Sequence, residues 1–283
     1  MILYKKSAAL ATHLFRLKNA GKKIGFVPTM GALHAGHLSL LNASRSENEI
    51  SICSIFVNPT QFNDQNDFRK YPTSLERDIT LLDQAKTDLI FLPGVAEIYP
   101  DGVDHLKHYD LGNLENLLEG KFRPGHFQGV CQVMNRLLDM VNPHNLYMGQ
   151  KDYQQCMVVK RLLQLMHSDI VLNKCPTQRE PDGLAMSSRN MRLSETEKKE
   201  AVSIFKVLQF CRHNLKPGSL LQLKVTARQM LEERHFKPDY VEISDADTLE
   251  PVSTWDGEQK LIALVAAYLN GVRLIDNMPL QGD

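Results

Sequence analysis

The spacing of apolar residues changes along the first part of the chain from a helical period to short continuous runs. Leu10, Leu14 and Leu17 recur at helical spacing, and residues 24–27 then form a short buried run of the strand type. Residues 50–57, ISICSIFV, form a continuous run rich in β-branched side chains. Such runs are typical of parallel strands that helices cover on both faces. The pattern therefore predicts a helix followed by two buried strands.

The alternation continues to about residue 175. A helix is expected from about Gly36, and Thr73 with Glu76 forms a capping-box pattern ahead of a helix that ends near Lys86. The other expected elements are strands at 88–94, 145–149 and 170–175 and helices at 126–141 and 152–166. Strands that alternate with helices at this spacing predict an α/β fold with a doubly wound (Rossmann-like) parallel sheet.

The pattern changes after about residue 180. Ser194 and Glu197 form a second capping box ahead of a helix, and LKPGS at 215–219 is a plausible break between helices. Short strand patterns follow at 239–245, 260–269 and 272–277. We therefore expect two domains: residues 1–180 would form a Rossmann-like nucleotide- and substrate-binding domain, and residues 181–283 a smaller C-terminal α+β domain that closes over the site.

Composition narrows the classes of partner. The 33 basic and 33 acidic side chains cancel, so the chain lacks the field that would attract a nucleic acid or an anionic membrane, and neither is expected as a partner. The five cysteines form no C-x-x-C pair, which favours reduced thiols and a cytoplasmic setting. No run of 18 apolar residues occurs, so no membrane-spanning segment is expected.

The stretch PTMGALHAGH, residues 28–37, lies at the first turn from a strand to a helix, where open parallel sheets commonly bind phosphate groups. Gly31 and Gly36 lack a Cβ, which lets a phosphoryl group approach the backbone, and the N-terminus of the helix attracts anions. His34 and His37 are three residues apart, so in one helical turn they share a face. Both imidazoles could then donate to one phosphate chain.

Other interpretations of the two histidines stay open at this point. They could be surface or capping residues, and a metal site is weaker still because no third ligand follows at a zinc-like spacing. The sequence contains no G-x-x-x-x-G-K-[ST], G-x-G-x-x-G or G-x-S-x-G motif. The prediction of a nucleotide site therefore rests on HAGH and the polar stretches described next.

Two further polar stretches are candidates for phosphate binding. GQKDYQQ, residues 149–155, follows the strand NLYMG and should project from the same sheet edge as HAGH. Lys151 could neutralise phosphate, and Asp152 could accept from a ribose hydroxyl or serve as a helix N-cap. AMSSRN, residues 185–190, lies at the domain junction and offers hydroxyls and the forked cation of Arg189, although it could also be a solvated linker.

Two loops offer groups for an acidic substrate. FVNPTQFN, residues 56–63, contains the amides of Asn58 and Gln61, and FRPGHFQGV, residues 122–130, contains Arg123 and His126 beside a Pro-Gly turn. The alternative for the first is an Asn-Pro turn with an exposed amide, and for the second an ordinary loop.

Together these stretches resemble the pantothenate synthetase (pantoate–β-alanine ligase) family of the nucleotidylyltransferase superfamily. HAGH matches its HIGH-like motif, and the resemblance covers essentially the whole chain through PTMGALHAGH, SIFVNPTQF, Tyr71-Pro72, EIYP, RPGHFQGV, GQKDYQQ, REPDGLAMSSRN and RLIDN. It implies an ATP-dependent ligase in which the carboxylate of (R)-pantoate attacks the α-phosphorus of ATP, with Mg²⁺ assisting. The amine of β-alanine then attacks the pantoyl adenylate, which releases AMP and pantothenate. The family also suggests a homodimer.

The resemblance implies a role for each matching position. His37 would be the catalytic proton donor, with His34 beside it on the phosphates and Lys151 and Arg189 as further catalytic cations. Gln61 and Gln155 would bind pantoate, with Gln61 also reaching β-alanine, and Asn58, Arg123 and His126 would lie around the acid substrates. Asp78 is a candidate outer-shell group near Mg²⁺, which would be bound mainly through the phosphates. The ATP-binding set would be Met30, Gly31, His34, Gly36, His37, Gly149, Gln150, Lys151, Asp152, Gln178, Met186, Ser187, Ser188 and Arg189.

Two positions depart from the family pattern, and rival functions remain. Gln178 stands where the family has an aliphatic residue against adenine, and Thr60 replaces a larger apolar residue. One rival is a nucleotidylyltransferase that forms a dinucleotide product, and another is a non-catalytic nucleotide-binding module. A tRNA-charging relative fits less well, because the chain is short, neutral and without a basic stripe.

Overall fold

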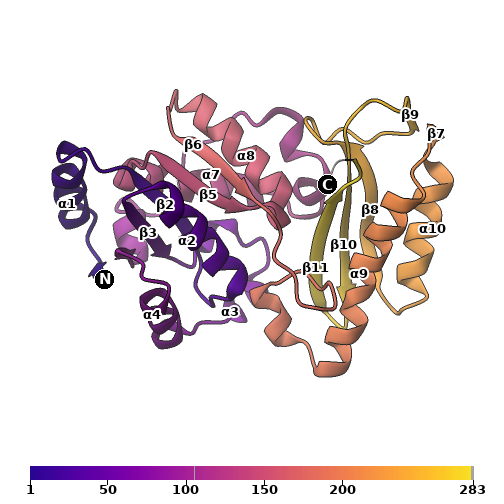
Figure 1. The fold of residues 1–283 in the computed structure, drawn as a ribbon, viewed down its shortest axis with the longest axis horizontal. Helices are drawn as coiled ribbons and strands as arrows, with labels where there is room; N and C mark the ends of the chain where they lie inside the picture. Colours follow the sequence, from indigo (N-terminus) through magenta and orange to yellow (C-terminus); the bar gives the residue numbers. More distant parts are fainter. Residues whose placement is uncertain (105, 282–283) are drawn as a thin grey trace. The chain divides into compact units, whose positions relative to one another are not determined.

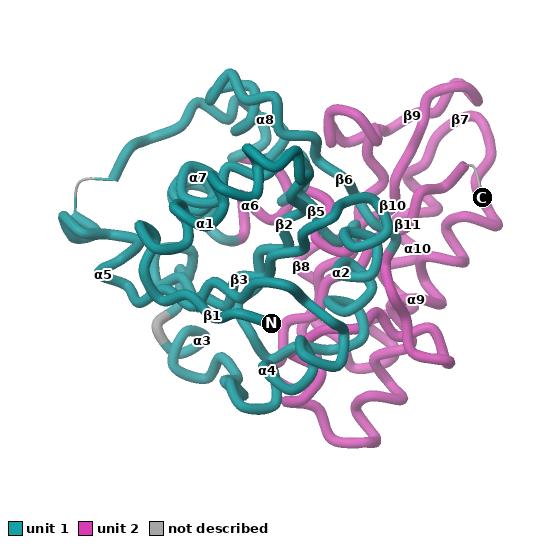
Figure 2. Tube along the Cα trace, turned by 60° about the vertical axis from the view of Figure 1, so that its left-hand side comes forward, with its two compact units in different colours: residues 1–115, 123–150, 155–176 teal, residues 116–122, 151–154, 177–283 magenta. Residues whose placement is uncertain are grey.

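The structure is a computed structural model that describes residues 1–104 and 106–281, apart from the side chain of residue 65. The chain forms two compact units (Figure 2). Unit 1 comprises residues 1–115, 123–150 and 155–176, and unit 2 comprises residues 116–122, 151–154 and 177–283. Residues 116–122 and 151–154 thus belong with the C-terminal unit, although the chain on either side of them belongs to unit 1. That the units act as separate domains, with the second closing over a site, remains a prediction.

Unit 1 is built on a six-stranded sheet in the order β1-β4-β3-β2-β5-β6, in which all neighbours are parallel. This confirms the predicted doubly wound sheet. Strands β3, β2, β5 and β6 of this sheet are labelled in Figure 1. The strands are β1 (Ile2–Tyr4), β2 (Ile24–Thr29), β3 (Ile50–Ile55), β4 (Leu89–Phe91), β5 (Asn145–Gly149) and β6 (Val171–Cys175). The helical elements are α1 (Ser7–Asn19), α2 (Ala35–Glu47), η1 (Pro59–Gln61), α3 (Gln65–Arg69), α4 (Leu75–Gln84), α5 (Val95–Ile98), η2 (Gly112–Glu115), α7 (His126–Val141), η3 (Gln150–Asp152) and α8 (Tyr153–Leu165). Residues 151–154, in η3 and at the start of α8, belong to unit 2.

Helices cover both faces of this sheet because successive strand residues enter different cores. Phe26 and Ile52 pack with residues of α1, α7 and α8, whereas their neighbours Val27 and Cys53 pack with residues of α2 and α4. Side chains alternate between faces along a strand, so a sheet that is buried on both sides needs apolar residues at every position. The unbroken apolar runs in the sequence have this origin.

Unit 2 is a smaller α+β unit, as predicted. Helices α9 and α10 pack on a three-stranded antiparallel sheet of order β11-β10-β8, and its core is distinct from those of unit 1. Its elements are α6 (Leu118–Phe122), η4 (Ser188–Arg192), α9 (Glu195–His213), β7 (Gly218–Ser219), α10 (Leu221–Glu232), β8 (Lys237–Asp245), β9 (Thr254–Trp255), β10 (Leu261–Leu269) and β11 (Val272–Pro279). None of the helices within residues 1–104 and 106–281 is long and apolar enough to cross a membrane.

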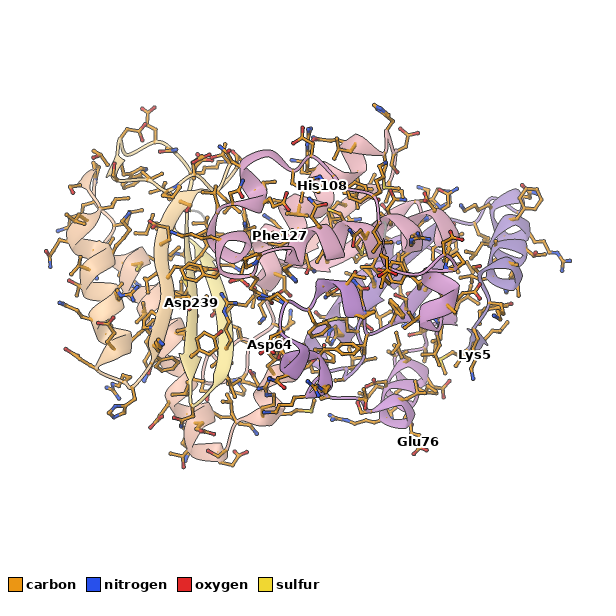
Figure 3. The ribbon with its side chains drawn as sticks, turned by 180° about the vertical axis from the view of Figure 1, so that it is seen from behind. Lys5, Asp64, Glu76, His108, Phe127 and Asp239 are labelled. Atoms are coloured by element: carbon orange, nitrogen blue, oxygen red, sulfur yellow. The ribbon has the colours of Figure 1, made fainter. Side chains whose placement is uncertain are left out.

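Most predicted elements are present, and one predicted cap is wrong. Helix α9 has the predicted capping box of Ser194 and Glu197. Helix α4 begins one residue later than the Thr73 box requires: Ser74 is its N-cap, and Glu76 is an exposed residue of the first turn (Figure 3). The hydroxyl of Ser74 instead donates to the carboxylate of Asp78 at 3.0 Å.

The thiols are free, and most of them are inaccessible. Cys53, Cys131 and Cys156 of unit 1 and Cys211 of unit 2 are buried, and Cys175 is half-buried. Burial raises the pKa of Cys53, Cys131 and Cys211 to about 12 because a thiolate is poorly solvated in an apolar core. The burial of four of the five thiols fits the expected buried thiols, and a reducing setting for the protein remains a prediction.

A carboxylate from a distant segment caps the N-terminus of α1. Ser7 donates its hydroxyl and its backbone N–H to Glu97 Oε1, at 2.6 and 2.8 Å, and Lys6 Nζ lies 3.0 Å from Glu97 Oε2. These bonds lower the pKa of Glu97 to about 2. The first N–H groups of a helix lack partners within it, so this carboxylate both satisfies a donor and opposes the helix dipole.

The Glu97→Gln variant is expected to be less stable than the wild type in a pH-dependent way. The pKa of Glu97 in the folded chain is below its ordinary value of 4.5, so the carboxylate stabilises the fold above that pH and loses this effect as the pH falls toward 2. Urea unfolding midpoints of the two proteins should therefore differ near neutral pH and converge near pH 2. The exposed Glu76→Gln serves as the control, and an equal gap at both pH values would contradict the assigned bonds.

Candidate active site

The HAGH residues lie where β2 ends and α2 begins. His34 is the N-cap of α2, and its Nδ1 accepts the backbone N–H of Gly36 at 3.1 Å. His37 reaches back, and its Nδ1 accepts the backbone N–H of His34 at 3.3 Å. The ring centroids are 4.0 Å apart, which confirms that the two imidazoles share a face. The alternative interpretation of capping histidines is also correct, and a capping role does not exclude phosphate binding by the other ring nitrogens.

The capping bonds determine which nitrogen of each imidazole carries the proton. A nitrogen that accepts an N–H must present its lone pair, so Nδ1 of both rings is unprotonated. In the neutral ring the proton then lies on Nε2. His34 and His37 therefore each carry an Nε2–H donor at the N-terminus of α2, where the helix dipole also favours negative charge.

A buried carboxylate from α4 shapes the turn ahead of HAGH. Asp78 is 1% exposed, and it accepts the backbone N–H groups of Ala32 and Leu33, each at 2.8 Å. Gly31 has a φ of +81°, and a Cβ there would lie 3.0 Å from Asp78 Oδ2. The glycine at 31 thus accommodates Asp78, and its contact with a phosphate stays a prediction.

The expected role of Asp78 near a metal is not tested by these contacts. Both of its oxygens bind the turn in unit 1. Within the described part of the chain, no three or more His, Cys, Asp or Glu side chains gather in a way that could hold a metal ion.

HAGH and the GQKD stretch begin at neighbouring strands. β2 and β5 are parallel, with Gly25 opposite Asn145 and Phe26 opposite Leu146. The chain runs from β2 to β3 and β4 on one side, and β5 and β6 lie on the other, so the topological switch point lies between β2 and β5 (Figure 1). Gly149 ends β5 and Gln150 follows it. The prediction that both motifs leave the same edge of the sheet is confirmed.

A chain of hydrogen bonds fixes the orientation of the Gln61 amide in unit 1. Asn58 is 1% exposed; its Oδ1 accepts the backbone N–H of Thr60, and its Nδ2 donates to the carbonyl of Gly129 at 3.1 Å. The same Nδ2 donates to Gln61 Oε1 at 3.1 Å, so the oxygen of Gln61 faces Asn58 and its NH₂ group faces the other way. That NH₂ contacts Met30 Sδ, a weak acceptor, at 3.1 Å.

Thr60 and Tyr99 complete this network. The Tyr99 hydroxyl donates to Asn58 Oδ1 at 2.8 Å, and it lies 3.2 Å from the hydroxyl of Thr60. Burial raises the pKa of Tyr99, so its hydroxyl stays protonated and acts as a donor. The hydroxyl of Thr60 also donates to Asn58 Oδ1, at 3.2 Å.

Arg123 and His126 also act on this loop. His126 is 5% exposed, and its Nδ1 lies 2.8 Å from the backbone carbonyl of Gln61, to which it must donate. Its Nε2 then accepts from Arg123 Nη1 at 3.1 Å. The structure thus brings together the predicted residues Met30, Asn58, Gln61, Arg123 and His126 in unit 1. Gln155 is a partly buried residue of α8 in the same unit.

Lys151 and Asp152 belong to unit 2. The two charges are 3.9 Å apart, and the carbonyl of Lys151 accepts from Asn277 Nδ2 at 2.8 Å. The following Tyr153 donates its hydroxyl to the carbonyl of Ala246 at 2.7 Å. Gln154 is buried, and its side chain binds the backbone of residues 117 and 119.

The AMSSRN stretch of unit 2 is hydrogen-bonded to the backbone of Gln178. Met186 donates its backbone N–H to the carbonyl of Gln178 at 3.0 Å, and Arg179 pairs with Ala185 in an antiparallel bridge. The hydroxyl of Ser187 caps the short helix η4 by accepting the N–H of Arg189 at 3.2 Å. The Gln178 side chain is exposed, while its backbone carbonyl holds the position of Met186.

Four residues that organise these groups were not predicted. Tyr99 and Gly129 support Gln61, and Asp276 and Asn277 of β11 bind Arg179 and the backbone of Lys151. All four lie in the stretches EIYP, RPGHFQGV and RLIDN. Residue type and spacing alone give no signal for them, because each acts through a partner that is distant in the sequence.

Comparison with known proteins yields close relatives of full length. The family model described as pantoate-beta-alanine ligase matches residues 2–279. A pantothenate synthetase of Azobacteroides pseudotrichonymphae is 42% identical over 280 residues, which cover 98% of this chain and 99% of the relative. One from Bacteroides fragilis is 41% identical over 270 residues, with 95% of each chain covered.

Solved structures give the same result. The crystal structure of pantothenate synthetase from Thermus thermophilus matches with a TM-score of 0.90 and 39% identity, over 100% of both chains. The pantoate-beta-alanine ligase of Francisella tularensis, complexed with beta-gamma ATP and beta-alanine, matches with a TM-score of 0.83 and 37% identity, over 100% of this chain and 99% of that chain. The chain therefore belongs to the pantoate–β-alanine ligase family.

Proposed function

We propose that the enzyme condenses (R)-pantoate with β-alanine in two steps at the expense of ATP. The pantoate carboxylate attacks the α-phosphorus of ATP, which forms pantoyl adenylate and releases pyrophosphate. The amine of β-alanine then attacks the acyl carbon, and the C–O bond to AMP breaks as the amide bond forms. The observation that carries this proposal is the paired histidine cap of α2 at the switch point of the sheet, where open α/β folds bind nucleotides.

In the first step, the groups around ATP act by positioning and charge stabilisation. Negative charge grows on the phosphate oxygens, and the Nε2–H donors of His34 and His37 would stabilise it together with the N-terminus of α2. Lys151 and Arg189 would add cations from unit 2, and the remaining expected ATP contacts are Met30, Gly31, Gly36, Gly149, Gln150, Asp152, Gln178, Met186, Ser187 and Ser188. Mg²⁺ would be bound mainly through phosphate oxygens.

The acid substrates would be bound by oriented amides. The NH₂ group of Gln61 is directed away from Asn58, so it can donate to the carboxylate or hydroxyl of pantoate, with Gln155 as a second amide. Arg123 and His126 would act through the backbone of Gln61. Closure of unit 2 would exclude water, which otherwise hydrolyses the mixed anhydride before the second step.

Exchange of labelled pyrophosphate into ATP tests this proposal. Exchange should require pantoate and proceed without β-alanine, because only adenylate formation is reversed. Pantothenate and AMP should appear only when β-alanine is added. A dinucleotide product would favour the rival nucleotidylyltransferase, and ATP binding without pantoate-dependent exchange would favour a non-catalytic module.

The remaining expectations concern the setting of the enzyme. We propose a cytoplasmic homodimer with no nucleic-acid or membrane partner, consistent with a chain whose charges cancel. Mass measurement in solution decides the oligomeric state.

A further inference from the structure

Two consecutive buried residues of β11 bind two separate segments of unit 2. Asp276 is 5% exposed and Asn277 is 3% exposed. The carboxylate of Asp276 accepts two parallel bonds from the guanidinium of Arg179, at 2.6 and 3.0 Å. The amide of Asn277 donates to the carbonyl of Lys151 at 2.8 Å. One strand thus contacts both segments that carry the expected phosphate-binding groups of this unit.

The contact with Arg179 fixes the base of the loop that leads to residues 186–189. Arg179 also donates to the carbonyl of Gly183 at 3.1 Å, and its guanidinium lies 4.5 Å from the ring centroid of Phe205. A Cβ on Gly183 would lie 2.1 Å from that ring, so the loop turns tightly against α9. Ala185 forms an antiparallel bridge with Arg179, so the fixed position of Arg179 also fixes the backbone of the next residue, Met186.

Charged groups of both segments affect the pKa of Asp276. Burial raises the pKa of Asp276 above its ordinary value, and the Arg179 guanidinium and, less strongly, the Lys151 ammonium oppose this effect. A buried ion pair is a weak source of net stability, because desolvation offsets most of the attraction. The bidentate geometry instead fixes the orientation of the Arg179 guanidinium.

We propose that Asp276 and Asn277 are positioning residues, which hold Lys151 and residues 186–189 in one rigid arrangement so that both act on the phosphates of ATP together. This inference rests on the proposed function. Neither residue touches substrate in this role: Asp276 acts through Arg179, and Asn277 acts through the backbone of Lys151.

The test compares the two half-reactions in the full-length enzyme. Asp276→Asn keeps the shape of the side chain and removes its charge, so kcat/KM for ATP and the rate of pyrophosphate exchange should fall by about tenfold or more. The value of kcat/KM for β-alanine at saturating ATP, which reports steps after the adenylate, should change by less than about threefold. Equal losses in both, or no loss in either, would overturn the proposal.

A matched control separates positioning from stability. Lys224→Gln breaks a different ion pair of unit 2, which is partly exposed, with Glu242 at 2.8 Å, and should leave kcat/KM for ATP within about twofold of the wild type. If Asp276→Asn does not fold, Asn277→Ala provides the second variant, with the same expected loss of kcat/KM for ATP.

Double variants show whether the effect passes through the named groups. Asn277→Ala should cost about tenfold in the wild type and less than about twofold in a Lys151→Ala background, because that background keeps the carbonyl that Asn277 binds but already lacks the ammonium that Asn277 is proposed to position. Additive losses would overturn the proposed route through Lys151. If the wild type shows no pantoate-dependent exchange, the proposed function itself has failed, whereas normal wild-type exchange with unaffected variants rejects only the positioning role.

Discussion

Replacement of His37 by alanine is expected to lower kcat by about a hundredfold or more. The Nε2–H of His37 lies in the first turn of α2, where ring and helix dipole would act on the same phosphate oxygens. Because charge on these oxygens grows only as the reaction proceeds, the loss should fall on kcat. Steady-state rates of pantothenate formation give kcat and the KM of ATP. A rise in the KM of ATP alone would assign the ring to ground-state binding.

The alanine variant also removes a helix cap, and a second variant separates the two effects. His37 Nδ1 accepts the N–H of His34, and loss of such a cap costs about 1 kcal/mol. Glutamine at this third helical position can accept the same N–H and cannot transfer a proton. His37→Gln should therefore unfold at nearly the same urea concentration as the wild type and still lose most of its turnover. Full turnover in His37→Gln would mean that the cap, not the imidazole, matters.

Gly129→Ala is expected to destabilise unit 1 by about 3 kcal/mol and to raise the KM of pantoate roughly tenfold or more. Helix propensity alone predicts the opposite sign, a gain of about 1 kcal/mol. The steric clash outweighs the gain in helix propensity, because a Cβ at Gly129 would lie 2.2 Å from the carbonyl oxygen of Thr60 and 2.6 Å from Gln61 Cα. Backbone atoms cannot rotate away, so η1 must shift and carry the Gln61 amide with it.

Gly94→Ala is the control for this substitution. Gly94 has a φ of −83°, and a Cβ there would meet no atom within 4 Å. Urea unfolding and the KM of pantoate should therefore stay close to the wild type. A Gly129→Ala enzyme with unchanged stability and unchanged KM would show that the contact between α7 and η1 does not position Gln61.

Local patterns predicted much of the fold, because the sheet is buried on both faces and its strands are unbroken apolar runs. The two histidines were also predictable, since a spacing of three residues in one helical turn leaves few arrangements. Chain order placed HAGH and the GQKD stretch at one edge of the sheet, because both follow parallel strands.

The supporting contacts were not predictable, because they join residues that are far apart in the sequence. Asp78 binds a turn 45 and 46 residues away, and Arg179 binds Asp276 across 97 residues. Nothing in the local pattern distinguishes Gly129 from a helix glycine that could be replaced. Its importance is visible only in the structure, where the backbone of η1 packs against it. The Thr73 capping box failed for a similar reason, since Ser74 starts the helix and turns its hydroxyl toward Asp78.

The buried thiols give each unit its own reporter of opening. A thiol with a pKa of about 12 in a closed core reacts with an alkylating reagent only when the surrounding structure opens. Cys53 lies in the central sheet of unit 1, and Cys211 lies in helix α9 of unit 2. Mass-spectrometric alkylation rates at these two positions therefore measure how often each unit unfolds locally, and no cysteine has to be introduced by mutation.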